Sequence, residues 1–69
     1  MPLILLDLYE SRKIVQMIGS DEQIRHLKNL GFREGENVSI VSHWDGNLIV
    51  KIHDSRIAIS QQLACKILV

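Results

Sequence analysis

The side chains best suited to bind a metal ion in this sequence are its three histidines and one cysteine. Imidazole nitrogen and thiolate sulfur are ligands that zinc and related transition metals prefer. A tight turn expected at Asp45-Gly46 would pair His43 near Leu48 and His53 near Val38. The two imidazoles would then stand about five residues apart, at about 3.3 Å per residue, which is too far to share one ion. We therefore assign no metal site and no cofactor, and expect transition metals to bind weakly or between two copies.

Groups that could carry out acid–base or nucleophilic catalysis are scattered. The aspartates stand in expected caps and turns, where carboxylates usually hydrogen-bond to the backbone: Asp7, Asp21, Asp45 and Asp54. Cys65 begins an apolar stretch and is expected to be half-buried. Gly31 and Gly35 lack the Lys-Ser/Thr pair that follows the glycines of a phosphate-binding loop. We predict that the protein is not an enzyme.

The size and charge of the chain limit its partners. We expect one domain, residues 1–69, with eight basic and eight acidic side chains and a net charge of zero. Proteins that bind nucleic acid usually carry a basic stripe, so we expect no such partner, and low charge leaves a homodimer open. The apolar run Leu3–Leu6 is far shorter than the roughly 20 residues that span a bilayer, so no membrane insertion is expected. The unpaired Cys65 suits the reducing cytoplasm.

One helix is predicted at residues 21–30. Ser20 and Gln23 have the spacing of a capping box, and Gly31 can end the helix in a left-handed conformation. Apolar side chains recur at helical spacing on one face, with Leu27 and Leu30 expected in the core. This helix is the only long one that the sequence predicts.

Alternation of apolar and polar residues predicts that most of the rest is β-structure. Strands are expected at residues 12–18, 38–40, 48–52, 57–59 and 65–69. Asp54-Ser55 is expected to form the second hairpin turn, and Gln61–Ala64 a single helical turn. Because closure removes exposed strand edges, we predict a mainly β fold, a small five-stranded barrel with one short α-helix.

One block of residues is similar to a known family. The block Leu27-x-x-Leu30-Gly31-Phe32-x-x-Gly35-x-x-Val38 resembles the signature of FeoA proteins, and Ile49–Ile52, Arg56–Ile59 and Ile67–Val69 extend the similarity. The resemblance implies an SH3-like barrel and a cytoplasmic accessory of bacterial ferrous-iron uptake. Its implied partner is FeoB, a membrane transporter with a cytoplasmic GTPase domain. The sequence departs from the family at Glu10-Ser11, where Pro-Gly is expected, and in both hairpin turns.

Two segments are candidates for the contact with that partner. Trp44, with His43 beside it, stands at the expected hairpin turn, and tryptophan is enriched among residues that dominate binding energy. The alternative is that Trp44 folds back as a lid over the barrel. The segment holding Leu3, Leu5 and Leu6 either packs on the barrel or docks a partner or a second copy.

Four basic residues are a third and weaker candidate for the contact with the partner. Arg12, Lys13, Arg33 and Arg56 are expected to be solvated, and as a patch they would suit an acidic surface of the partner.

A first alternative function is the SH3-like regulatory module of an iron-dependent transcriptional repressor. A second is a generic small barrel that binds peptide or RNA, against which stand the neutral charge and the small number of aromatic residues.

Overall fold

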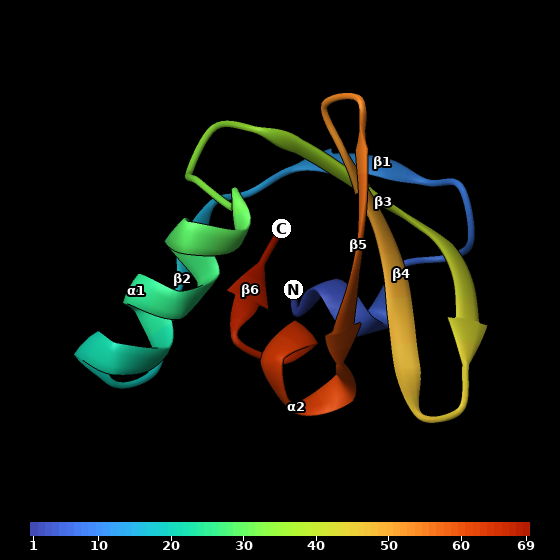
Figure 1. Cartoon of the computed structure of the whole chain (residues 1–69). Coiled ribbons are helices and arrows are strands. Elements are labelled where there is room, and N and C mark those ends of the chain that lie inside the picture. Colours follow the sequence, from blue (N-terminus) through green and yellow to red (C-terminus); the bar gives the residue numbers. More distant parts are fainter.

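A computed structural model describes residues 1–69, and its elements form two sheets. A four-stranded sheet has the order β1-β3-β4-β5, and a two-stranded sheet pairs β2 with β6 (Figure 1). In chain order the elements are the 3-10 helix η1 (Leu3–Leu5), β1 (Ser11–Lys13), β2 (Gln16–Met17), α1 (Asp21–Leu30), β3 (Asn37–Trp44), β4 (Asn47–Ile52), β5 (Ser55–Ser60), α2 (Gln61–Ala64) and β6 (Ile67–Leu68). The mainly β fold is therefore confirmed. Neither α-helix has the length and hydropathy of a membrane-spanning segment.

The predicted helix and its caps are confirmed. The Ser20 hydroxyl accepts a hydrogen bond from the Gln23 amide at 3.1 Å, and the Ser20 amide donates to Gln23 Oε1 at 2.9 Å. The helix ends at Gly31, whose φ of 110° is left-handed and whose amide donates to the carbonyls of Leu27 and Lys28. These bonds satisfy backbone groups that a helix end otherwise leaves unpaired. Figure 1 shows α1 at one side of the molecule, away from the four-stranded sheet.

Strands β3, β4 and β5 form a meander with two tight turns. The first turn is at Asp45-Gly46, as predicted, with φ values of 49° and 77°. The second was expected at Asp54-Ser55, but it lies one residue earlier because Ile52 pairs with Ser55. His53 therefore occupies the turn, with a left-handed φ of 53°.

A β-bulge interrupts β3. Ile40 pairs with Val50, whereas Ser42 pairs with Ile49, so Val41 has no partner opposite it on β4. Side chains alternate between the two faces of a strand, and one extra residue reverses that alternation beyond it. The bulge therefore turns the even-numbered side chains at the end of β3 away from the core.

Two predicted strands differ from the structure. Residues 12–18 form two strands rather than one, because β1 pairs with β3 and β2 pairs with β6, and the chain crosses between sheets at Ile14. Residues 65–69 contain only the short β6, preceded by the helical turn α2, which was predicted. The structure thus has six strands where five were expected.

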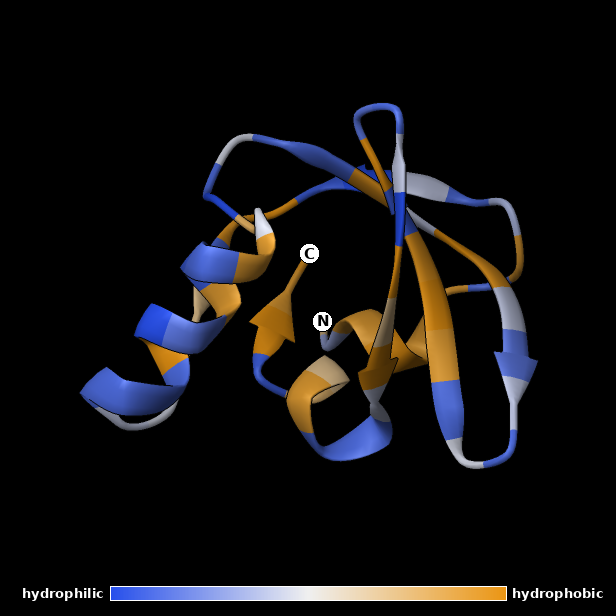
Figure 2. Cartoon of the chain, viewed as in Figure 1, coloured by the Kyte–Doolittle hydropathy of each residue, from blue (hydrophilic) through white to orange (hydrophobic).

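The core lies between the curved sheet, the short second sheet and the helices, and Figure 2 shows hydrophobic residues lining this interior. It consists of fifteen buried residues: Leu3, Leu6, Ile14, Met17, Leu27, Phe32, Val38, Ile40, Leu48, Val50, Ile52, Ile59, Ala64, Ile67 and Val69. Of the signature residues, Leu27, Phe32 and Val38 are core, whereas Leu30 is only partly buried against it. Gly35 has a left-handed φ of 89°, in a turn that a side chain would strain.

The two ends of the chain lie together. The Met1 amino group donates to the Val69 carbonyl oxygen at 2.8 Å, and the Val69 amide donates back to the Met1 carbonyl at 2.7 Å. Pro2 also bridges Leu68 in antiparallel orientation. The N and C labels of Figure 1 stand close to each other for this reason. The first residues of the chain thus extend the β2-β6 pair.

Candidate partner-binding surface

Trp44 stands at the end of β3 with 71% of its surface exposed. It pairs with Asn47 across the first hairpin, on the outer face of the sheet, because the bulge at Val41 reverses the alternation. The lid interpretation is therefore wrong for Trp44. His43 is also exposed and pairs with Leu48, as expected.

The N-terminal leucines divide into core and surface. Leu3 is 0% and Leu6 4% exposed, so these two side chains belong to the core, and the hypothesis that they contact a partner is corrected. The reason is the helix η1, because residues three apart in a 3-10 helix point to the same side. Leu5 points to the other side and is 66% exposed, so it stays a candidate.

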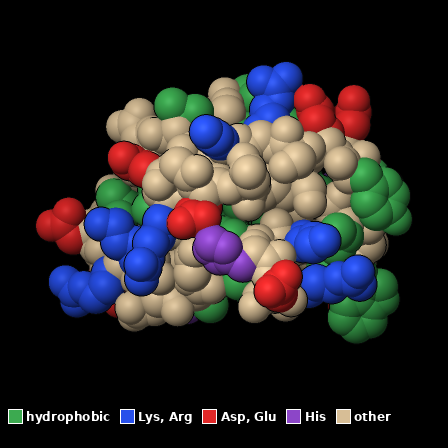
Figure 3. All heavy atoms as spheres, turned by 90° about the horizontal axis from the view of Figure 1, so that it is seen from above, with side chains coloured by type: hydrophobic (Ala, Val, Ile, Leu, Met, Phe, Trp, Pro, Cys, Tyr) green, Lys and Arg blue, Asp and Glu red, His purple; other side chains and the backbone are tan.

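Two exposed apolar residues near β3 were missed in the sequence. Tyr9 is 74% and Leu8 48% exposed, although Leu8 bridges Ile40 and the Tyr9 amide donates to the Ile40 carbonyl at 2.8 Å. Trp44 lies four residues further along β3, a rise of about 13 Å. We call Leu8, Tyr9 and Trp44 the apolar end. Figure 3 shows large hydrophobic side chains standing out at the end of the molecule away from α1.

The sequence gives one indication that Leu8 and Tyr9 are exposed, which is their position between the apolar run and a polar stretch. Leu8-Tyr9 continues the apolar run past Asp7 into a polar stretch, where no buried strand follows directly. Tyr9 has a left-handed φ of 67° that only the structure reveals, in a turn where a glycine would be the usual residue. The turn directs the aromatic ring into solvent.

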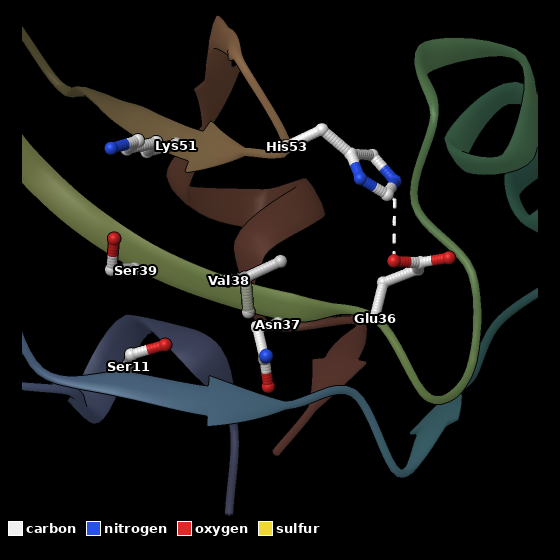
Figure 4. A pocket seen from close by; sticks show the side chains of 7 residues that line it. All are labelled: Ser11, Glu36, Asn37, Val38, Ser39, Lys51 and His53. Carbon is white, nitrogen blue, oxygen red and sulfur yellow. Dashed lines mark ion pairs between the residues drawn. The ribbon is translucent and has the colours of Figure 1, made fainter.

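A polar hollow lies at the other end of β3. It has a volume of about 370 Å³ and is lined by Ser11, Glu36, Asn37, Val38, Ser39, Lys51 and His53 (Figure 4). Val38 is its single hydrophobic residue. Strands β1, β3 and β4 each contribute to the lining, because Ser11 pairs with Ser39 and Ser39 with Lys51. The hollow therefore offers hydroxyl, amide and ammonium donors on one surface.

One contact closes a side of this hollow. His53 Nε2 lies 3.2 Å from Glu36 Oε2, with both side chains more than a third exposed. Figure 4 shows the imidazole aimed at the carboxylate across the gap between the β4–β5 turn and the residue before β3. The pair is a salt bridge when the imidazole is protonated and a hydrogen bond when Nε2 carries the single ring proton. Exposed pairs of this kind contribute at most about 1 kcal/mol.

The metal-binding side chains are not gathered. No three or more of the His, Cys, Asp and Glu residues lie close enough to hold one ion. His43 pairs with Leu48, while His53 follows Ile52, the partner of Val38, so the two histidines stand at opposite ends of β3. Cys65 is exposed at the end of α2 and not half-buried in a strand, which corrects the sequence interpretation.

Comparison with known proteins identifies similar sequences and folds. A family model described as a FeoA domain matches residues 1–69. No curated protein matches the chain. The solved structure of Stenotrophomonas maltophilia FeoA complexed with zinc is 27% identical, with a TM-score of 0.85 over 99% of this chain and 87% of that chain. It is described as a prokaryotic SH3 domain protein and a candidate activating factor of ferrous iron transport.

Two longer proteins contain the same fold. The iron(II) transport protein A of Clostridium thermocellum is 27% identical, with a TM-score of 0.89 over 99% of this chain and 43% of that one. A manganese-dependent transcriptional repressor is 11% identical, with a TM-score of 0.87 over 97% of this chain and 39% of that one. The second likeness is one of fold alone. The SH3-like expectation is confirmed by these structures.

Proposed function

Since the chain belongs to the FeoA family and thus to ferrous iron transport, we propose that it is a non-enzymatic accessory that binds the cytoplasmic part of the transporter FeoB. The family match over residues 1–69 carries this proposal. The proposed compartment is the cytoplasm, where the free thiol of Cys65 stays reduced.

The apolar end supports a role in protein contact. Tryptophan and tyrosine are enriched at the centre of protein interfaces, and Trp44 and Tyr9 are each more than 70% exposed. Exposed aromatic surface gains free energy when a partner removes it from water. We propose that Trp44 is the principal anchor and that the exposed residues Tyr9, His43 and Leu5 add to the contact.

The mechanism follows from binding alone. A bound accessory shifts a transporter toward whichever conformation it binds more tightly. The coupling is reciprocal, so a transporter state with higher affinity for the accessory is also the state that the accessory favours. Iron transport or nucleotide turnover would change through that population shift, with no chemical step on the accessory.

The test measures binding and stability of one variant side by side. Trp44→Ala should bind the purified cytoplasmic part of FeoB at least about thirtyfold more weakly, which corresponds to about 2 kcal/mol. Its melting midpoint should stay close to the wild-type value, because the ring is 71% exposed. Leu5→Ser should weaken binding to a smaller extent, and Arg25→Ala, on the exposed face of α1, serves as the control.

Two results would contradict the proposal. If wild-type protein does not bind the cytoplasmic part of FeoB in calorimetry, the partner assignment is wrong. If it binds and both Trp44→Ala and Leu5→Ser bind as tightly, the partner is right and the contact surface lies elsewhere.

The fold likeness to a repressor supports one alternative function, that of a regulatory module in a transcription factor. The two functions differ in what accompanies the gene. A neighbouring gene for a large membrane GTPase supports the transport function, and a neighbouring DNA-binding domain supports the repressor function.

A further inference from the structure

The outer face of the four-stranded sheet carries cations that have no acidic partner in the chain. Lys13, Lys51 and Arg56 are exposed. The ion pairs of the chain join Arg12 to Glu10 and His53 to Glu36, and neither involves these three cations. In a chain with equal numbers of acidic and basic residues, this is a local excess of positive charge.

The register of the strands explains why these side chains share one face. Val38 points into the core, so its neighbours Asn37 and Ser39 point outward. Side chains of paired residues lie on the same side of a sheet. Lys13 pairs with Asn37, and a row crosses the four strands through Ser11, Ser39, Lys51 and Arg56. We call Lys13, Lys51 and Arg56, with Ser11, Ser39 and Asn37, the basic face.

Within this row two like charges stand opposite each other. Lys51 and Arg56 are directly paired across β4 and β5, where side chains of a pair start about 5 Å apart. Like charges in that position destabilise a sheet unless a counter-charge lies between them. No hydrogen bond or ion pair within the chain involves the Lys51 or Arg56 side chain. The position is suited to an anionic group supplied by another molecule.

We propose that the basic face binds an extended acidic segment of a protein partner. One carboxylate would lie between Lys51 and Arg56, and a second would reach Lys13. Lys13 on β1 and Lys51 on β4 are separated by two strand spacings across the sheet and by two residues along the strands. Their separation is therefore about 12 Å, which is the length of about four residues of extended chain. Figure 4 shows the Ser11 and Ser39 side chains next to each other on β1 and β3, and Lys51 pointing away from the His53–Glu36 pair.

The spread of the charges favours a peptide over a nucleic acid. A single phosphate would engage Lys51 and Arg56 and leave Lys13 unused. A nucleic-acid strand carries a phosphate at every nucleotide and needs a continuous basic stripe, whereas this face has cations only at Lys13 and at the Lys51–Arg56 pair. The basic face lies over the first residues of β3, Leu8 and Tyr9 lie against Ile40 in its middle, and Trp44 stands at its end, so one partner can cover both surfaces. The proposal requires no particular transporter.

The test is an NMR titration of the folded, ¹⁵N-labelled protein with a blocked peptide of sequence Glu-Ser-Ser-Ser-Glu. Saturable shifts are expected at backbone amides of β1, β3, β4 and β5 around the basic face, and they should weaken as salt is added. The double variant Lys51→Gln, Arg56→Gln should bind about tenfold more weakly. Its melting midpoint should equal or exceed that of wild type, because the variant removes a repulsion.

The controls separate a specific site from general charge attraction. Arg25→Gln, Lys28→Gln removes the same charge from α1 and should leave binding unchanged. The proposal is overturned if this variant loses as much affinity, if the Gln-Ser-Ser-Ser-Gln peptide causes the same shifts, or if no saturable shift occurs. It is also overturned if inorganic phosphate or a single-stranded oligonucleotide binds this face more tightly than the acidic peptide. None of these experiments contains FeoB, so their outcome is independent of the transporter assignment.

Discussion

Replacing Leu27 by alanine tests how α1 is held to the barrel. Leu27 is 0% exposed and is the one fully buried residue of the helix, while Ile24 and Leu30 are only partly buried. Loss of a buried leucine side chain typically costs about 2–5 kcal/mol, from lost burial and from the cavity left behind. Because α1 lies at one side of the molecule, a shift of the helix can close part of that cavity. We therefore expect the lower half of this range.

That loss is large for a chain of this size. Domains below about 70–80 residues rarely have more than about 3–5 kcal/mol of net stability from their core. Leu27→Ala should thus remove most of the free energy of unfolding. At about 4–8 °C per kcal/mol, the melting midpoint should fall by at least about 8 °C.

The assay is thermal unfolding followed by circular dichroism, with urea titration to obtain the free energy. Arg25→Ala, on the exposed face of the same helix, is the matched control and should change stability by less than about 0.5 kcal/mol. If Leu27→Ala and Arg25→Ala melt at the same temperature, Leu27 does not anchor the helix and the assigned packing of α1 is refuted.

Three further predictions concern caps, turns and the exposed ion pair. Ser20→Ala loses the acceptor for the Gln23 amide and should cost about 1 kcal/mol in urea unfolding; no loss would mean that water caps the helix equally well. Gly35→Ala places a side chain at a φ of 89° with no atom within 4 Å, so only backbone strain, about 1–2 kcal/mol, should appear. A larger loss would reveal a steric clash. A double-mutant cycle of His53→Ala with Glu36→Gln should give a coupling below about 1 kcal/mol, whereas a larger coupling would contradict the exposed geometry.

Local signals in the sequence were sufficient where short-range chemistry decides the structure. The Ser20–Gln23 capping box and Gly31 predicted both ends of α1, because these bonds form between residues close in sequence. Asp45-Gly46 predicted the first hairpin and thereby the pairing of His43.

The candidate site was less predictable because its exposure depends on long-range pairing. The bulge at Val41 carries no glycine or proline to mark it, yet it decides that Trp44 faces outward. Alternation alone also cannot show that residues 12–18 leave one sheet and join another. Leu3 and Leu6 look equivalent to Leu5 in the sequence, and only the short 3-10 turn separates the surface residue from the core residues.

The pairing of the two chain ends has a consequence for the order of folding. The β3–β4–β5 meander joins residues that are near in sequence, so its loops close at small entropic cost. The bonds between Met1 and Val69 span 68 positions and bring together the most distant segments of the chain. We infer that the meander forms in the transition state and that the ends join after it. Leu68→Ala should then accelerate unfolding in stopped-flow measurements and leave the refolding rate nearly unchanged, whereas slower refolding would place the joined ends in the nucleus.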